Sequence, residues 1–280
     1  MNRTLILIAL GGACFAAAPA AATFDLNIIY AASVTPEQRA VFEQAEATWE
    51  SLITGYQPGI TLTGITITAS TPNLVDPPGS DILGQAGPNG FRPFQGGFRL
   101  TQTGFMEFDS ENVDDLIAQG FFDDVVVHEI GHILGIGTNW TLNNVYTNGT
   151  GQYTGQHGVA AYNAEFGQTG TFIPVELGGN SGTSNKHWDE VDLGAALTGI
   201  TDTMGRDLTH EIMTGWLNIG RPPYIADFTV QSLRDIGFTV VPEPSTAAGM
   251  ALAMVVLGWQ VRRRQWRISA PPSKDRLPAL

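Results

Sequence analysis

The residues best suited to chemistry form the pentapeptide HEIGH at 128–132. His128 and His132 are four residues apart, so they project from the same face of a helix on successive turns. Two imidazoles placed in this way can bind one Zn²⁺ ion, each at about 2.0–2.1 Å. Glu129 follows the first histidine directly, where its carboxylate can reach a zinc-bound water and act as its general base. The pattern therefore predicts a metal site that activates water.

The segment around this motif predicts a buried helix at 122–134. Valines at 125–127 and isoleucines at 130 and 133 make the helix apolar on nearly all sides, which is typical of buried helices. Two buried histidines beside a buried glutamate need a partner that offsets their lost hydration. A metal ion provides one, so the setting favours a zinc site over a helix with surface histidines.

A third protein ligand is expected, because catalytic zinc usually keeps three protein ligands and one open position. Thr138 stands where a compact HExxHxxGxxH motif has its third histidine, and threonine is a poor zinc ligand. The remaining histidines are His157, His187 and His210. His157 lies between glycine-rich residues, which predicts a solvated loop, and His210 lies near an apolar turn where it can be structural. The residue types alone leave these three alternatives open.

Longer motifs resemble those of the leishmanolysin-type metallopeptidases, which are metzincins. Gly135 stands where these peptidases turn the chain after the zinc helix (HExxHxxG). In that family an insertion precedes a third histidine that is followed by tryptophan, and here 54 residues separate His132 from the HW pair at His187. The Met-turn of the family, E-[LI]-M-T-G, is matched by EIMTG at 211–215. The similarity extends over nearly all of 24–240.

The resemblance implies a fold, a ligand set and an activity. The fold is an α+β metzincin-type zinc peptidase fold, with a twisted mixed sheet and the active-site helix above a smaller, mostly irregular or helical subdomain. His187 would complete the site with His128 and His132, and Met213 would form an apolar floor beneath the zinc without binding it. The implied activity is that of a zinc-dependent endopeptidase that uses Glu129 as general base. The alternative is a non-catalytic zinc-binding surface or matrix protein on the same fold.

One spacing departs from the family's pattern. Met213 follows His187 by 26 residues, which is longer than the usual interval. Residues 194–209 are therefore expected to form an extra loop near the cleft. That loop contains Met204, a second and less well-flanked candidate for the Met-turn methionine.

Charge divides the chain of 280 residues into an acidic body and basic ends. Residues 23–241 carry 25 acidic and 7 basic side chains, a net of −18, which argues against nucleic acid as a partner. Cys14 is the only cysteine, which excludes an intramolecular disulfide and a CxxC motif. Acidic, glycine-rich loops allow Ca²⁺ binding, but no EF-hand spacing supports it. Zn²⁺ is therefore the one cofactor that the sequence predicts.

The N-terminus has the pattern of a secretory signal peptide. Arg3 is followed by an apolar run at 5–10 and by small residues that end in AAA at 20–22, an A-x-A cleavage site. We expect residues 1–22 to be removed on export, and residues 23–240 to form one metallopeptidase domain.

The C-terminus resembles the PEP-CTERM sorting signal of Gram-negative bacteria. A PEP box at 242–244, an apolar run at 245–261 and three arginines at 262–264 follow one another in order. The apolar run of 17 residues would span about 25 Å as a helix, a marginal length for a bilayer core of ~30 Å. The resemblance implies a sorting signal with a membrane span at 241–267 and a basic cytoplasmic tail at 268–280.

This layout predicts a location and partners. The body would be exported to the cell surface or beyond, anchored stably or transiently through the C-terminal span. The implied partners are a protein or peptide substrate, an exosortase-type sorting machinery and the membrane. The alternative for the apolar run is an ordinary single-span anchor.

The remaining pattern predicts the elements that must position the site. The sequence TPEQ at 35–38 predicts a capping box, with Pro36 in the first turn of a helix that buries Phe42, Ala45 and Trp49. Alternation of apolar and polar residues predicts a strand at 24–30. Further predicted elements are strands at 61–69, 98–101 and 104–108, a loop at 73–97, and a short helix at 110–118.

Overall fold

The computed structural model describes residues 24–74, 83–191, 194–216 and 222–242. Its largest sheet has the strand order β1-β3-β5-β4. The bounds are β1 (Asp25–Tyr30), β3 (Gly64–Ser70), β5 (Thr101–Phe108) and β4 (Gly84–Phe91). The first three of these strands are parallel and β4 is antiparallel to β5. The sheet is therefore mixed, and β4 forms one edge of it.

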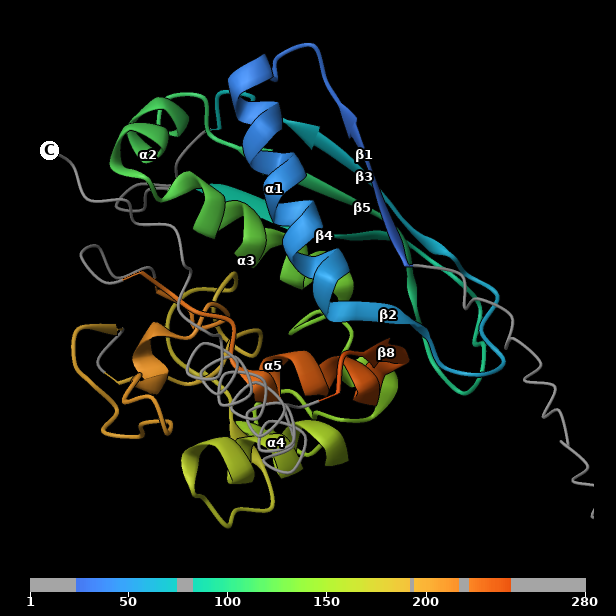
Figure 1. Ribbon diagram of the computed structural model, residues 1–280, viewed down its shortest axis with the longest axis vertical. Coiled ribbons are helices and arrows are strands. Elements are labelled where there is room, and N and C mark those ends of the chain that lie inside the picture. Colours follow the sequence, from blue (N-terminus) through green and yellow to red (C-terminus); the bar gives the residue numbers. More distant parts are fainter. Residues whose placement is uncertain (1–23, 75–82, 192–193, 217–221, 243–280) are drawn as a thin grey trace, which may run out of the picture.

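Three helices pack with this sheet in the upper part of the molecule (Figure 1): α1 (Pro36–Leu52), α2 (Val113–Gln119) and α3 (Phe122–Leu134). The predicted capping box is confirmed, because Thr35 Oγ1 accepts from Gln38 N at 3.2 Å and Gln38 Oε1 accepts from Thr35 N at 2.9 Å. Helix α1 packs on α3, and Trp49 Nε1 donates to Val127 O at 2.9 Å. This contact fixes α3 against the first helix.

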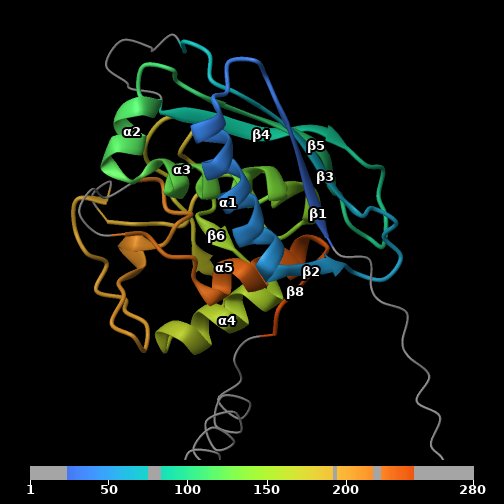
Figure 2. The same cartoon turned by 45° about the horizontal axis from the view of Figure 1, so that its top comes forward.

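The lower part of the molecule consists of shorter elements joined by long connections (Figure 2). Two two-stranded sheets pair β2 (Ile53–Tyr56) with β8 (Phe238–Val240) and β6 (Gln152–Tyr153) with β7 (Ile173–Pro174). Helix α4 (Gln156–Phe166) packs on α5 (Asp227–Ser232). The whole is a mixed α/β architecture, compatible with the predicted α+β class.

Two groups of aromatic side chains form the centres of these parts. In the upper part, Phe108 and Phe122 pack edge to face with ring centroids 5.2 Å apart, and Phe42 packs against both. In the lower part, Trp188 lies 4.6 Å from Trp140 and 5.1 Å from Phe228, again between ring centroids. Each group buries large apolar rings, whose burial is the main favourable term in folding.

Three sequence predictions for the sheet need correction. The predicted loop at 73–97 contains strand β4, whose sequence GQAGPNGF has low strand propensity. It forms a strand because it pairs with β5, with irregular register around Pro88 and Gly90, as an edge position permits. A single strand, β5, covers the strand predicted at 104–108 but only the last residue of the one predicted at 98–101. The strand expected to start at 61 begins at Gly64.

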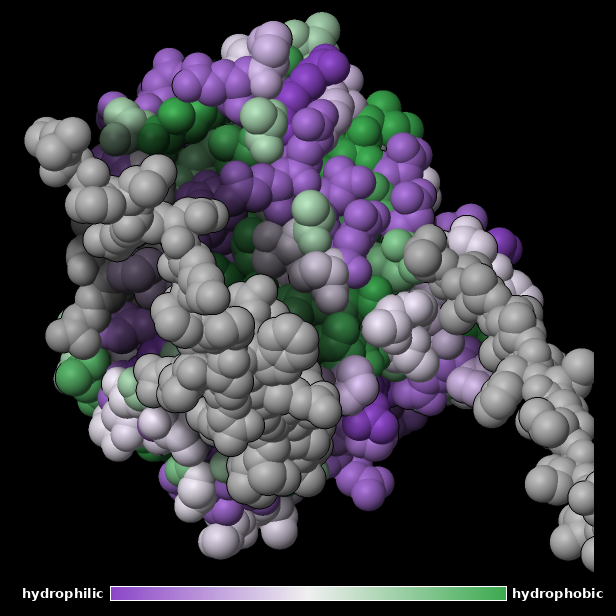
Figure 3. Space-filling view, viewed as in Figure 1, coloured by the Kyte–Doolittle hydropathy of each residue, from purple (hydrophilic) through white to green (hydrophobic). Residues whose placement is uncertain are grey.

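Hydrophilic residues cover much of the upper half of the face shown in Figure 3. Within the described ranges, no helix is both long and apolar enough to cross a membrane. The predicted signal peptide at 1–22 lies outside the described residues. So does the predicted membrane span at 245–261.

Candidate metal centre

Three histidines converge where α3 meets the lower part of the molecule. The Nε2 atoms of His128 and His132 are 3.1 Å apart, and the Nε2 atom of His187 lies 3.0 Å from that of His132 and 3.2 Å from that of His128. The four-residue spacing on α3 therefore places its two histidines as predicted, and His187 joins them from the segment before Trp188. Within the described part of the chain, these histidines are the one group of this kind that could hold a metal ion.

Backbone carbonyls determine which nitrogen of each ring faces the centre. The Nδ1 atom of His128 lies 2.6 Å from Ile212 O, that of His132 lies 3.0 Å from Ile136 O, and that of His187 lies 2.8 Å from Thr183 O. A carbonyl only accepts, so each Nδ1 carries the proton and each Nε2 presents a lone pair.

Three lone pairs that face one another at 3.0–3.2 Å need a cation between them. Ligands of a tetrahedral metal at about 2.0–2.1 Å are separated by roughly 3.3 Å, which is close to the sides of this triangle. The residues therefore fit a metal ion. The second hydrogen bond of each ring is the arrangement that orients histidine ligands in metal sites.

Burial keeps all three rings neutral. Desolvation lowers the pKa of His128, and it lowers the pKa of His187 to about 3, with His128 adding to the effect. Burial also lowers the pKa of His132 well below its usual value, and the two neighbouring histidines lower it further. Neutral imidazoles are the form that binds metal, so the site needs no proton release from these rings at neutral pH.

Glu129 is buried next to His128 on α3 and does not belong to the histidine cluster. Burial raises the pKa of its carboxyl group to about 7. A carboxylate with a pKa near the working pH can both accept and return a proton, which suits a general base. Glu129 thus follows His128 on α3, and the three candidate ligands are all histidines.

The two candidate methionines differ sharply in position. Met213 is fully buried beneath α3, and a Cβ atom built on Gly131 would lie 2.5 Å from Met213 Sδ. Met204 is 74% exposed. The residue that packs under the histidine-bearing helix is therefore Met213, as the EIMTG motif predicts.

A buried carboxylate holds the turn that carries Met213. Glu211 accepts from Met213 N at 2.6 Å, from Ala226 N at 3.1 Å and from Thr229 Oγ1 at 2.7 Å. Thr229 Oγ1 in turn accepts from Trp188 Nε1 at 2.9 Å. This chain of bonds connects the turn, α5 and the neighbour of His187. The residue type of Glu211 did not predict this structural role, although its place in the EIMTG motif could have indicated it.

The other two histidines lie elsewhere. His157 is the second residue of α4, which corrects the prediction of a solvated loop, and its N–H donates to Asp235 Oδ1 at 2.9 Å. The acidic side chain of Asp235 also accepts from Gly158 N at 2.8 Å and so satisfies the start of this helix. His210 ends a short 3-10 helix, Leu208–His210, and is likewise no member of the cluster.

A cavity of about 760 Å³ opens between β4 and the chain segment that precedes His187. Ala86, Gly87 and Pro88 of β4 line one side of it, and residues from 179 to 186 line another. Gly137 and Thr138, which follow α3, line it as well. Edge strand β4 and the chain just before His187 thus face a common space.

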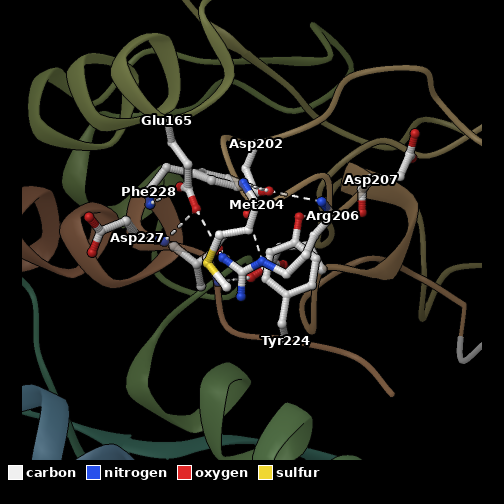
Figure 4. A network of polar contacts seen from close by, with 11 residues as sticks. Glu165, Asp202, Met204, Arg206, Asp207, Tyr224, Asp227 and Phe228 are labelled. Carbon is white, nitrogen blue, oxygen red and sulfur yellow. Dashed lines mark hydrogen bonds and ion pairs between the residues drawn. The ribbon is translucent and has the colours of Figure 1, made fainter. Parts of the chain in front are cut away.

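The segment at 194–210 is fastened to α4 and to Tyr224 (Figure 4). Arg206 Nε donates to Asp202 Oδ2 at 2.6 Å, and the Arg206 guanidinium lies 3.9 Å from the centre of the Tyr224 ring. Glu165 of α4 accepts from Phe228 N at 3.0 Å and lies 3.9 Å from the Arg206 guanidinium. Polar bonds therefore order a segment that the sequence predicted only as an extra loop.

Comparison with protein-family models found no match. A search of curated proteins found none either. The resemblance to leishmanolysin-type peptidases thus stays a prediction based on the motif residues.

Proposed function

We propose that this chain is an exported zinc-dependent endopeptidase with a metzincin-type fold, similar to the leishmanolysin-type peptidases. One observation carries the proposal: His128, His132 and His187 turn three unprotonated Nε2 atoms toward one point, with Glu129 next to the first of them. Three histidines with an adjacent carboxylate are typical of hydrolytic zinc sites.

The histidines and Glu129 would have different roles in the reaction. The three histidines would hold the ion, and when bound it would polarise a substrate carbonyl and lower the pKa of water. Glu129 would take a proton from the attacking water and return it to the leaving amine. The pKa of about 7 of this carboxyl group supports both transfers at neutral pH.

The position of β4 supports a peptide as the substrate. As an edge strand, β4 can accept an extended chain through backbone hydrogen bonds. The cavity between β4 and 179–186 could then receive a substrate side chain. Helix α3 packs on β4, so a peptide held along β4 would lie next to the helix that carries His128 and His132.

Export is part of the proposal and rests on the sequence. The pattern at 1–22 and the PEP box with its apolar run and arginines support delivery to the surface of a Gram-negative cell. Fractionation of cells that express the full chain, with and without residues 242–280, would test it. Retention of both forms in the cytoplasm would contradict export.

The experiment that tests the enzymatic function compares the buried Glu129 with Glu46, a half-buried glutamate on α1. Glu129→Ala should keep zinc but lose turnover by roughly 10²–10⁴-fold, because a general base contributes that much. Burial also raises the pKa of Glu46 on α1 to about 7, yet Glu46→Gln should leave activity unchanged. Casein zymography with and without a chelator, together with zinc content by mass spectrometry, gives both readouts. A zinc-loaded wild type without activity would instead favour the non-catalytic binding protein.

A further inference from the structure

The cavity between β4 and the segment before His187 is lined by a charged residue that belongs neither to the ligand set nor to the general base. Lys186 lines it, directly before the ligand His187. The other lining residues are glycines, serines, threonines, asparagines, alanine, proline and phenylalanines, so Lys186 is the one charged residue among the described residues of the lining. It is also the only lysine between 23 and 241.

This ammonium has no carboxylate partner, although its domain is strongly acidic. Both ion pairs found in the described ranges are made by Arg206, so no described acidic group lies within 4.0 Å of Lys186. Residues 23–241 contain 25 acidic side chains, and yet none of those in the described ranges neutralises it. An unpaired, partly buried charge in a cavity attracts an opposite charge more strongly than one in open solvent does.

The backbone holds Lys186 close to the histidines. Its carbonyl group lies against Gly137, at the end of the turn that follows α3, and its N–H donates to Thr183 O at 3.3 Å. These two contacts fix the backbone of Lys186 between the ligand His187 and the turn that follows α3.

The opposite wall leaves room for a ligand. A Cβ atom built on Gly87 of β4 would meet no atom within 4 Å. A chain extended along β4 could place a side chain into the cavity from this side. The cavity is otherwise lined by neutral polar groups, which can solvate a carboxylate without repelling it.

We propose that Lys186 selects substrates with an aspartate or glutamate side chain that binds in this cavity. This inference rests on the proposed peptidase function and adds the substrate class. The net charge of the domain repels acidic peptides at long range, so the preference arises from this local contact. It should therefore persist at moderate salt, where long-range repulsion is screened.

Equilibrium binding tests the inference separately from catalysis. Zinc-loaded Glu129→Gln protein is titrated with sets of fluorescent peptides. The peptides of one set are identical except for Glu, Gln or Lys at one position, and each set varies a different position of the peptide. At one position the Glu peptide should bind about 10-fold more tightly than the Gln peptide. Lys186→Met should abolish the difference, Lys186→Arg should keep it, and Lys186→Glu should favour the Lys peptide. Arg39→Met on α1 is the control and should retain the Glu preference.

Lysine acetylation gives a second readout, because Lys186 and Lys274 are the only lysines of the chain. The Glu peptide should protect Lys186, whereas the Gln peptide should protect it far less and Lys274 should react equally in both cases. Equal binding of all peptides, or an unchanged Glu preference in Lys186→Met, would overturn the proposed role of Lys186 without contradicting the peptidase function. A Glu preference in a protein that cleaves no peptide would overturn the peptidase function without contradicting the role of Lys186. Absence of all peptide binding would count against both.

Discussion

The two parts of the molecule that form the metal centre hold their residues by different means. His128 and His132 belong to a regular helix, α3, in which Val126, Ile130 and Ile133 are fully buried. Apolar packing over many atoms fixes this helix, and such packing tolerates small losses at single positions. His187 and Met213 belong to irregular chain in the lower part.

In the lower part, a small number of side-chain hydrogen bonds takes the place of the regular hydrogen bonding of helices and strands. Glu211 alone satisfies two backbone N–H groups and the Thr229 hydroxyl. Thr183 O orients His187, and Ile212 O, in the turn before Met213, orients His128. Each buried bond of this kind leaves an unsatisfied group when it is broken, so irregular chain depends on single residues more than α3 does.

The largest expected effect removes the ligand that the lower part contributes. His187→Gln should lower zinc affinity by more than the roughly 10–100-fold that loss of a supporting partner costs, because one of three ligands is gone. His157→Gln, at the start of α4, should leave zinc content unchanged. Zinc per protein after dialysis against a weak chelator, measured by mass spectrometry, checks both. Zinc loss in the His157 variant with retention in the His187 variant would show that the ligand set is wrong.

The upper part is also the one whose local structure the sequence predicts best. The capping box at 35–38, the buried positions Phe42, Ala45 and Trp49, and the helix at 122–134 all depend on neighbours within one or two turns. Such local patterns are visible in a single sequence. The pair of histidines at four-residue spacing belongs to the same class of signal.

The features that the sequence did not reveal depend on distant partners. Strand β4 forms because β5 lies beside it, and its own residues favour a loop. The carbonyl groups that orient the three histidines belong to Ile136, Thr183 and Ile212. Every residue has a backbone carbonyl, so the residue type does not indicate which of them accepts such a bond. His187 could be chosen over the other histidines only through motif resemblance, since its distance to α3 is set by the tertiary fold.

Two glycines with nearly the same φ angle sharpen the comparison. Gly137 has φ +74° and a Cβ atom there would collide with the backbone of Lys186, whereas Gly120 has φ +73° and open space around it. Replacement by alanine costs about 1 kcal/mol or more at either position, because left-handed conformations disfavour side chains. Gly137→Ala should lower the free energy of unfolding by roughly 1–3 kcal/mol more than Gly120→Ala does, because the new methyl group must displace the backbone before His187.

Urea unfolding and zinc affinity of these two variants give separate readouts. Only Gly137→Ala should also weaken zinc binding, because the displaced segment carries His187. Equal losses of stability in the two variants, with equal zinc affinity, would show that the contact between the turn after α3 and Lys186 does not position the ligand.

The smallest expected effect concerns the pH dependence of the lower part. Burial raises the pKa of Glu211 to about 7, from an ordinary value of 4.5. The folded state therefore holds this proton more tightly than the unfolded chain does. The resulting stabilisation is complete below pH ~4.5 and is lost as the pH rises toward ~7.

Glutamine has no proton to lose, so Glu211→Gln should gain stability relative to the wild type as the pH rises through this window. Between pH 5.5 and 6.5 the gain should be roughly 1 kcal/mol, just below the limit of about 1.4 kcal/mol per pH unit for one group. Both proteins are unfolded in urea after removal of metal, so that the three histidines contribute equally and cancel in the difference. If Glu211→Gln instead shows the same pH dependence as the wild type, the carboxyl group is ionised throughout this range, and the three hydrogen bonds that it accepts outweigh its burial.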